Sequence, residues 1–260
     1  MRIIAGPCQF ESFDMAREVA EHCKGICDEY GIEYYFKASF DKANRSKGTS
    51  ARGVGLKQCM DHFWRLKAEI PELKTLTDVH ETHQVYNIAS EHDECVDVLQ
   101  IPALLSRQTD LIKAASLSGK IVNIKKGQFM SPYDCQDVLD KASGAREVWL
   151  TERGTSFGYN RLVVDFVGLN YMINNYPDVV FDVTHSIQNP AKVETSDRSA
   201  ITPLACAAAA MGVQNFFFEV HPDPDNAKSD GPNSLHLSDF KQLVCSLEKI
   251  SKKRLTFLAE

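Results

Sequence analysis

The stretch YYFKASFDKANRSKGTSARG, residues 34–53, begins as a strand and continues as a dense run of polar residues. Its opening Tyr34-Tyr35-Phe36 is rich in aromatic side chains, which suit a pleated and half-buried surface. Unpaired charges are costly to bury, so the cations and hydroxyls of residues 37–46 must face water or an anionic ligand. Arginine and lysine both suit phosphate and carboxylate groups. A solvated strand end followed by a charged turn is the alternative.

Short apolar runs with polar ends recur along the whole chain and alternate with helix-like segments. The expected strands are residues 2–6, 34–40, 74–79, 96–102, 121–127, 147–153, 179–185 and 215–221. The expected helices are residues 11–30, 54–69, 81–91, 107–118, 132–142, 162–175, 199–211 and 237–252. This alternation indicates parallel βαβ units, and eight of them predict one α/β domain, a closed (β/α)8 TIM barrel over residues 1–260. An open doubly wound sheet is the alternative, but no GxGxxG motif follows the first strand.

Charge and composition exclude several classes of protein. The 260 residues carry a formal net charge of −6, which argues against a nucleic-acid-binding surface. No apolar run reaches the length of about 18 residues that would indicate a membrane span. The first residues are too few and too polar for a signal peptide. The eight cysteines are scattered singly, so we expect reduced thiols in a cytoplasmic protein.

A TIM barrel carries its active site at the carboxyl-terminal ends of its strands. The polar residues at the expected strand ends are Cys8, Lys37, Lys42, Asp78, His80, Gln100, Arg107, Lys125, Lys126, Glu152, Arg153, His185, Glu219 and His221. A barrel that needed only stability would not place chemistry at every strand end, so the pattern indicates an enzyme. The cations Lys37, Lys42, Arg45, Lys125 and Arg153 suit a ligand with more than one anionic group.

Four residues are candidate metal ligands: Cys8, His185, Glu219 and Asp230. In a closed barrel the seventh, eighth and first strands are neighbours, so three of these side chains come from adjacent strand ends. A thiolate, an imidazole and two carboxylates suit one divalent transition metal, such as Zn²⁺, Fe²⁺ or Mn²⁺. The alternative is that the cysteine packs, the histidine is a hydrogen-bonded core residue and the glutamate forms a salt bridge. His221 is a competing ligand.

Eight stretches, in order along nearly the whole chain, resemble those of the 3-deoxy-D-manno-octulosonate 8-phosphate synthases, also called 2-dehydro-3-deoxyphosphooctonate aldolases. They are AGPC (5–8) with ES (11–12), FDKANRS (40–46), TDVHE (77–81), QIPALLSRQTDL (100–111), NIKKGQF (123–129), LTERGTSFGYNRLVVDF (150–166), FDVTHSIQ (181–188) and FFEVHPDPDNAKSD (217–230). The resemblance implies a transferase that condenses phosphoenolpyruvate with arabinose 5-phosphate for lipopolysaccharide biosynthesis.

A sibling family, which uses erythrose 4-phosphate in aromatic biosynthesis, typically has KPRTS where this chain has KANRS at 42–46. That family is the first alternative, and a non-catalytic sugar-phosphate-binding barrel is the second. The resemblance also implies the metal-dependent branch, because Cys8 stands where the metal-independent branch has asparagine.

The expected roles of individual residues follow from both lines of reasoning. We expect Lys37, Ser39, Lys42, Lys125 and Arg153 to bind phosphoenolpyruvate, and Asn44, Arg45, Ser46, Asp78 and Arg107 to bind the sugar phosphate. The expected catalytic residues are Lys42, His185, Cys8 and Asp230. The resemblance further implies a homotetramer in which Arg107 reaches the site of a neighbouring subunit. A surface ion pair between Arg107 and Asp110 is the plainer alternative.

Overall fold

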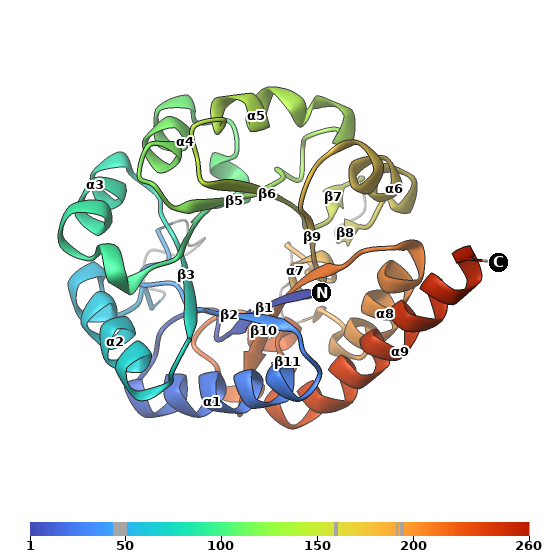
Figure 1. The fold of residues 1–260 in the computed structure, drawn as a ribbon, viewed down its shortest axis with the longest axis horizontal. Coiled ribbons are helices and arrows are strands. Elements are labelled where there is room, and N and C mark those ends of the chain that lie inside the picture. The colour runs from blue at the N-terminus through green and yellow to red at the C-terminus, as the bar shows by residue number, and fades with distance from the viewer. Residues whose placement is uncertain (44–50, 159–160, 191, 193–194, 260) are drawn as a thin grey trace.

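The structure is a computed structural model that describes residues 1–43, 51–158, 161–190, 192 and 195–259, with side chains up to residue 254. Its main sheet is a closed parallel barrel in the order β1-β2-β3-β4-β5-β6-β9-β10, in which β10 pairs again with β1 (Figure 1). The barrel strands are β1 (Arg2–Gly6), β2 (Glu33–Lys37), β3 (Lys74–Asp78), β4 (Val98–Ile101), β5 (Ile121–Lys125), β6 (Glu147–Glu152), β9 (Val179–Asp182) and β10 (Asn215–His221). Each overlaps its expected range, so the predicted (β/α)8 barrel is confirmed.

An outer ring of helices surrounds the barrel (Figure 1). The helices are α1 (Phe13–Glu29), α2 (Leu56–Glu69), α3 (Thr82–Glu91), α4 (Thr109–Ser116), α5 (Gln136–Lys141), α6 (Phe166–Asn175), α7 (Val183–Ser186), α8 (Ile201–Met211) and α9 (Phe240–Ala259). A short strand β11 (Leu235–His236) extends the sheet beyond β10, and β7 (Thr155–Ser156) forms an antiparallel pair with β8 (Leu162–Val163). No helix in the described residues is long and apolar enough to cross a membrane.

The interior of the barrel is filled by large side chains, so the barrel is a packed core and not a pore. One buried cluster contains Ile4, Tyr35, Leu76, Val98, Ile121, Trp149, Val180 and Phe217. Tyr35 and Trp149 meet edge to face at a centroid distance of 5.0 Å. The guanidinium of Arg2 lies 4.0 Å from the centre of the Trp149 ring and pairs with Glu33. This end of the barrel therefore supplies stability, and the opposite end is left for the site.

Successive side chains along each barrel strand point alternately into the barrel and out toward the helices. In β10, Phe216 and Phe218 pack outward into the helix layer, whereas Phe217 belongs to the interior cluster. Glu219 follows with the same inward parity as Phe217, so it faces the barrel axis at the carboxyl-terminal end. The register pairs Gly6 of β1 with Glu219, and Phe217 with Asp182 of β9. Three strands thus deliver their polar ends to one place.

Several predicted boundaries were wrong by three or four residues, and an aspartate explains two of them. The strand expected at 179–185 ends at Asp182, because the Asp182 side chain accepts the backbone N–H of His185 and starts the one-turn helix α7. The helix expected at 162–175 begins only at Phe166, where Asp165 caps it by accepting the N–H groups of Val167 and Gly168. In both places an aspartate cap, not the apolar pattern, sets the boundary of the element.

Candidate active site

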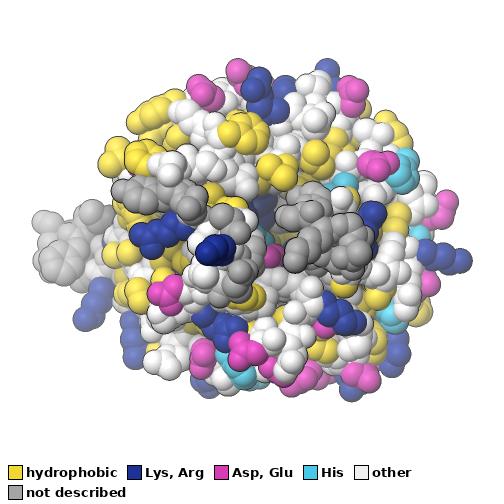
Figure 2. All heavy atoms as spheres, turned by 180° about the vertical axis from the view of Figure 1, so that it is seen from behind, with side chains coloured by type: hydrophobic (Ala, Val, Ile, Leu, Met, Phe, Trp, Pro, Cys, Tyr) yellow, Lys and Arg dark blue, Asp and Glu magenta, His cyan; other side chains and the backbone are white. Residues whose placement is uncertain are grey.

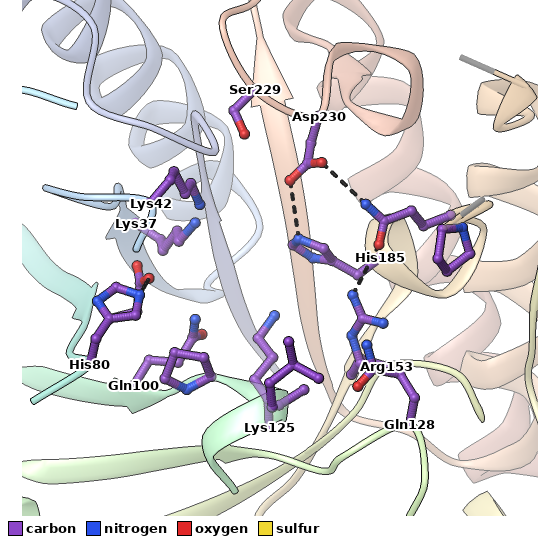
Figure 3. A pocket seen from close by; sticks show the side chains of 16 residues that line it. Lys37, Lys42, His80, Gln100, Lys125, Gln128, Arg153, His185, Ser229 and Asp230 are labelled. Atoms are coloured by element: carbon purple, nitrogen blue, oxygen red, sulfur yellow. Dashed lines mark hydrogen bonds and ion pairs between the residues drawn. The ribbon is translucent and has the colours of Figure 1, made fainter. Parts of the chain in front are cut away.

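A cavity of about 430 Å3 opens at the carboxyl-terminal ends of the strands. Figure 2 shows this face, where lysine and arginine side chains gather around the centre. The cavity is lined by Lys37, Lys42, Asp78, His80, Gln100, Pro102, Ala103, Leu104, Lys125, Gln128, Arg153, His185, Gln188, Pro190, Ser229 and Asp230. Figure 3 shows the labelled side chains pointing inward from both sides. Most of the chemistry expected at the strand ends therefore meets in one hollow.

Among the described residues, four lysine and arginine side chains line this cavity: Lys37, Lys42, Lys125 and Arg153. Lys37 is 1% exposed, and its Nζ donates to the Cys8 carbonyl at 3.0 Å and to Glu219 Oε1 at 2.9 Å. Arg153 donates from Nη2 to the Gln188 side chain at 3.3 Å, while its buried Nη1 has no hydrogen-bond partner in the described part of the chain. A buried donor without a partner is costly, so Arg153 is ready to receive an anionic ligand.

Lys42 lies beside a small network of polar groups at and just beyond the ends of β2 and β3. Its Nζ donates to Ser39 Oγ at 2.8 Å, Ser39 donates to the Asp78 carboxylate, and His80 Nε2 lies 3.2 Å from Asp78 Oδ2. Burial acts to lower the pKa of Lys42, but the facing Cys8 and Asp78 side chains outweigh it and raise that pKa above its usual value. Lys42 therefore remains a cation at neutral pH.

Asp182 is fully buried at the end of β9 and organises two other groups. It accepts from His185 Nδ1 at 2.7 Å and forms an ion pair with Lys125. Burial acts against the charge of Asp182, but His185 and Lys125 outweigh it and hold the pKa of this carboxyl well below its usual range. Burial lowers the pKa of Lys125 to about 8, although Asp182 opposes that shift. Burial also opposes a charged His185, but Asp182 raises its pKa to about 10.

The structure brings the four candidate metal ligands close together. Cys8 Sγ lies 2.9 Å from Asp230 Oδ2, and His185 Nε2 lies 3.6 Å from the same oxygen. His185 Nε2 is also 3.7 Å from Glu219 Oε1. Because Asp182 holds the Nδ1 atom of His185, the Nε2 atom is directed at the two acidic side chains, as Figure 3 shows for Asp230.

The four candidate ligands are not arranged around one common position that a metal ion could occupy. Within the described residues, no group of three or more cysteine, histidine, aspartate or glutamate side chains is arranged to hold a metal ion. The donors instead contact one another, and Lys37 occupies Glu219 Oε1. The chemistry of the set nevertheless fits a metal, because Glu219 Oε2 is buried and lacks a hydrogen-bond partner among the described groups.

Other expected site residues either fall outside the described part of the chain or do not line the cavity. Asn44, Arg45 and Ser46 fall outside the described residues. Arg107 is exposed beyond β4, does not line the cavity, and forms no ion pair with Asp110. His221 Nδ1 accepts the N–H of Asp223 at 3.0 Å, and its Nε2 faces Glu11 rather than the candidate metal ligands.

Sequence reasoning did not select Asp182, Gln128 or Gln188 for the site. The aspartate could have been found, because an aspartate three residues before a histidine at a strand end has the spacing of a helix cap. Gln188 donates to Asp230 Oδ1 at 3.2 Å and links it to Arg153. Its position depends on the turn made by α7, which the predicted longer strand did not include.

Comparison with known proteins identifies relatives over nearly the whole chain. Residues 1–256 match the model of the DAHP synthetase I family. A 2-dehydro-3-deoxyphosphooctonate aldolase of Fusobacterium nucleatum is 48% identical over 256 residues, covering 96% of this chain and 90% of that protein. Proteins of the same name from Caulobacter vibrioides and Desulfotalea psychrophila are 48% and 45% identical over 252 and 253 residues. Each alignment covers 95% of this chain, with 86% of the former protein and 89% of the latter.

Proposed function

The chain belongs to the DAHP synthetase I family, and we propose that it condenses phosphoenolpyruvate with D-arabinose 5-phosphate and water. The products are 3-deoxy-D-manno-octulosonate 8-phosphate and inorganic phosphate, and the sugar acid serves lipopolysaccharide biosynthesis. The observation that carries this proposal is the set of full-length relatives named 2-dehydro-3-deoxyphosphooctonate aldolase. The cationic cavity supports it, because both substrates are small anions.

Phosphoenolpyruvate presents a phosphate and a carboxylate on one small enol, and four cations in the cavity can neutralise both. Lys37, Lys125 and Arg153 are held by buried contacts, so they need not reorganise when the anion arrives. We assign the most direct contact to Arg153, since its Nη1 atom is buried and unpartnered among the described residues. Ser39 contributes to phosphoenolpyruvate binding by accepting a hydrogen bond from Lys42 Nζ, which it helps to position.

The carbon–carbon bond forms when C3 of the enol attacks the aldehyde carbon of the open-chain sugar. The aldehyde oxygen gains negative charge, and Lys42, which stays protonated, is placed to stabilise it. Positive charge develops at C2, where water adds. Asp230 remains ionised despite its burial, because His185 and Lys42 keep its pKa well below the usual range, so it can accept a hydrogen bond from this water. The resulting hemiketal phosphate expels phosphate by cleavage of its C–O bond.

We propose that Cys8, His185, Glu219 and Asp230 hold one divalent transition metal. The unpartnered Glu219 Oε2 and the mixed thiol, imidazole and carboxylate donors support this assignment. When bound, such an ion would supply Lewis-acid polarisation of an oxygen atom. A proton competes with the metal at His185, because the ring must lose its Nε2 proton before Nε2 can bind a metal, while Nδ1 keeps the proton shared with Asp182.

The acceptor sugar phosphate requires a cation and polar donors near the mouth of the cavity. We assign the cation to Arg45 and the polar donors to Asn44 and Ser46, with Asp78 directed at the sugar hydroxyls from inside the cavity. Arg107 is exposed and outside the cavity of its own chain, so we propose a homotetramer in which it reaches an adjacent site. The eight free cysteines fit a cytoplasmic location.

One assay tests the proposed activity. Phosphate release is measured with phosphoenolpyruvate and either arabinose 5-phosphate or erythrose 4-phosphate, with each substrate omitted in turn as a control. We expect turnover with arabinose 5-phosphate. Turnover of phosphoenolpyruvate with erythrose 4-phosphate, but not with arabinose 5-phosphate, would instead indicate the sibling activity. Binding without turnover would indicate a sugar-phosphate-binding protein.

A further inference from the structure

Glu11 connects two segments that carry proposed metal ligands, although it does not itself line the cavity. Its Oε1 atom accepts the backbone N–H of Lys228 at 2.9 Å and lies 3.5 Å from His221 Nε2. Glu11 is three residues beyond Cys8, and Lys228 is two residues before Asp230. One carboxylate therefore joins the segment after β1 to the segment after β10.

The β1 end of this connection is firmly fixed. The backbone N–H of Phe10 donates to the Ser39 carbonyl at 2.9 Å, and the Ser39 N–H donates to the Cys8 carbonyl at 3.4 Å. The Phe10 side chain is fully buried and stacks on His62 of α2 at a centroid distance of 5.0 Å. Glu11 thus projects from a rigid support that includes the Cys8 backbone.

The other end is an irregular segment that needs support from both flanks. Two 3₁₀ turns, Pro224–Asn226 and Gly231–Asn233, enclose residues 227–230, and Asp230 has a left-handed φ of 52°. On the β9 flank, Asn233 Nδ2 donates to the Thr184 carbonyl at 3.1 Å. On the β1 flank the segment is held by Glu11 and by Cys8 itself. Glu11, which is not itself a candidate metal ligand, therefore supports the backbone close to Asp230.

His221 lies beside the Glu11 carboxylate. Its Nδ1 atom accepts the N–H of Asp223, and its Nε2 lies 3.5 Å from Glu11 Oε1 with no hydrogen-bond partner among the described residues. The Glu11 side chain is only 14% exposed. One donor from the β10 side, the Lys228 backbone N–H, thus binds this nearly buried carboxylate, and the His221 ring lies beside it.

We propose that Glu11 is a positioning residue that holds Asp230 against Cys8 and so prepares the metal site. The inference rests on the proposed function only in taking a metal as the ligand of these residues. Supports of this kind typically affect metal affinity by about 10–100-fold.

The test uses the full-length, demetallated protein and Zn²⁺ alone, titrated against a competing chelator. The variants are Glu11→Ala, Glu11→Asp and Glu11→Gln, with Glu33→Ala as the control. Glu33 is also a carboxylate with several donors, Arg2 and Lys74 among them, but it lies at the opposite end of the barrel. Hydrogen exchange of the peptide containing residues 227–230 is measured in each protein, because this reports the segment without requiring metal or substrate.

We expect Glu11→Ala and the shortened Glu11→Asp to lose about 10–100-fold in Zn²⁺ affinity and to exchange faster at residues 227–230. Glu11→Gln should retain most of the affinity, because its amide oxygen can still accept the Lys228 N–H. Should Glu11→Ala not fold, the Asp and Gln pair provides the same comparison.

Three results would overturn the inference: unchanged Zn²⁺ affinity in folded Glu11→Ala or Glu11→Asp, unchanged exchange at residues 227–230, or an equal loss of affinity in Glu33→Ala. Zn²⁺ binding that is identical with and without Cys8→Ala would remove the proposed metal site together with this inference. A parent chain that binds Zn²⁺ through Cys8 but does not condense the substrates would reject only the proposed activity.

Discussion

Replacing Asp182 by asparagine should move the pH dependence of phosphoenolpyruvate use toward acid. The change is nearly isosteric, but it removes the negative charge that pairs with Lys125 inside the barrel. In the native protein, burial has already lowered the pKa of Lys125 to about 8. Without the carboxylate, nothing of opposite charge remains in direct contact with this amine among the described residues, so its pKa must fall further.

The size of the shift follows from the burial of both partners. Asp182 is fully buried and the Lys125 side chain is 5% exposed. Breaking a buried ion pair costs about 3–5 kcal/mol, and one pKa unit corresponds to about 1.4 kcal/mol. A shift of about two to three and a half pKa units toward acid is therefore expected. The charged lysine binds the anion and the neutral one does not, so kcat/KM for phosphoenolpyruvate should fall as the pH rises through the Lys125 pKa.

The assay is a profile of kcat/KM against pH, which reports groups of the free enzyme. Asp178→Asn is the matched control, because Asp178 precedes the same strand at its other end and pairs with Arg2. We expect a basic limb near pH 8 in the parent and control, displaced toward acid in Asp182→Asn. The variant also removes the carboxylate that raises the pKa of His185, and the altered support of this ring should lower the plateau. A basic limb at the same pH in all three proteins would refute the reasoning.

Three further predictions concern the metal, the barrel and the assembly. Chelation should abolish condensation and a divalent transition metal should restore it, whereas Cys8→Asn should recover at most part of the activity; full turnover after exhaustive demetallation would contradict the metal assignment. Trp149→Ala should lower the free energy of unfolding by about 3–5 kcal/mol in a urea titration, because its ring is fully buried beneath Arg2; a loss below about 1 kcal/mol would mean that the interior collapses around the change. Hybrids of Arg107→Ala and Arg45→Ala chains should regain activity if sites are shared, and no gain after confirmed subunit exchange would exclude the cross-subunit role of Arg107.

The barrel could be predicted from sequence because its signal is local and repeated. Each strand is a short apolar run of four to seven residues, and each is followed by a helix with one buried face. Boundaries were less predictable where a single side chain decides them. Asp182 ends β9 by capping α7, and Asp165 delays α6, although apolar residues surround both positions. A capping hydrogen bond depends on the backbone conformation, which an apolar pattern does not report.

The candidate site was predictable in composition but not in its internal pairing. Strand order alone places Cys8 and Glu219 at neighbouring strand ends, since β1 and β10 close the barrel. The sequence did not indicate that Lys37 would occupy Glu219, or that Asp182 would lie between Lys125 and His185. Lys125 and Asp182 are 57 residues apart in the sequence, Lys37 and Glu219 are 182 apart, and Asp182 reaches His185 only through the unexpected turn of α7. Their pairing therefore depends on side-chain directions inside the closed barrel.

These ion pairs explain how several cations can remain buried around the cavity before a substrate binds. Lys37 has Glu219 and Lys125 has Asp182, so neither amine pays the full cost of burial. The same carboxylates fix the amines in place, which means that an incoming anion meets donors that are already oriented. Arg153 differs, because its partner is the neutral Gln188 and its Nη1 atom has no partner among the described groups. Asp182, Asp230 and Glu152 offset part of the cost of burying this guanidinium, and an anion bound at Nη1 would offset more, so the stability of the buried charge is coupled to the capture of substrate.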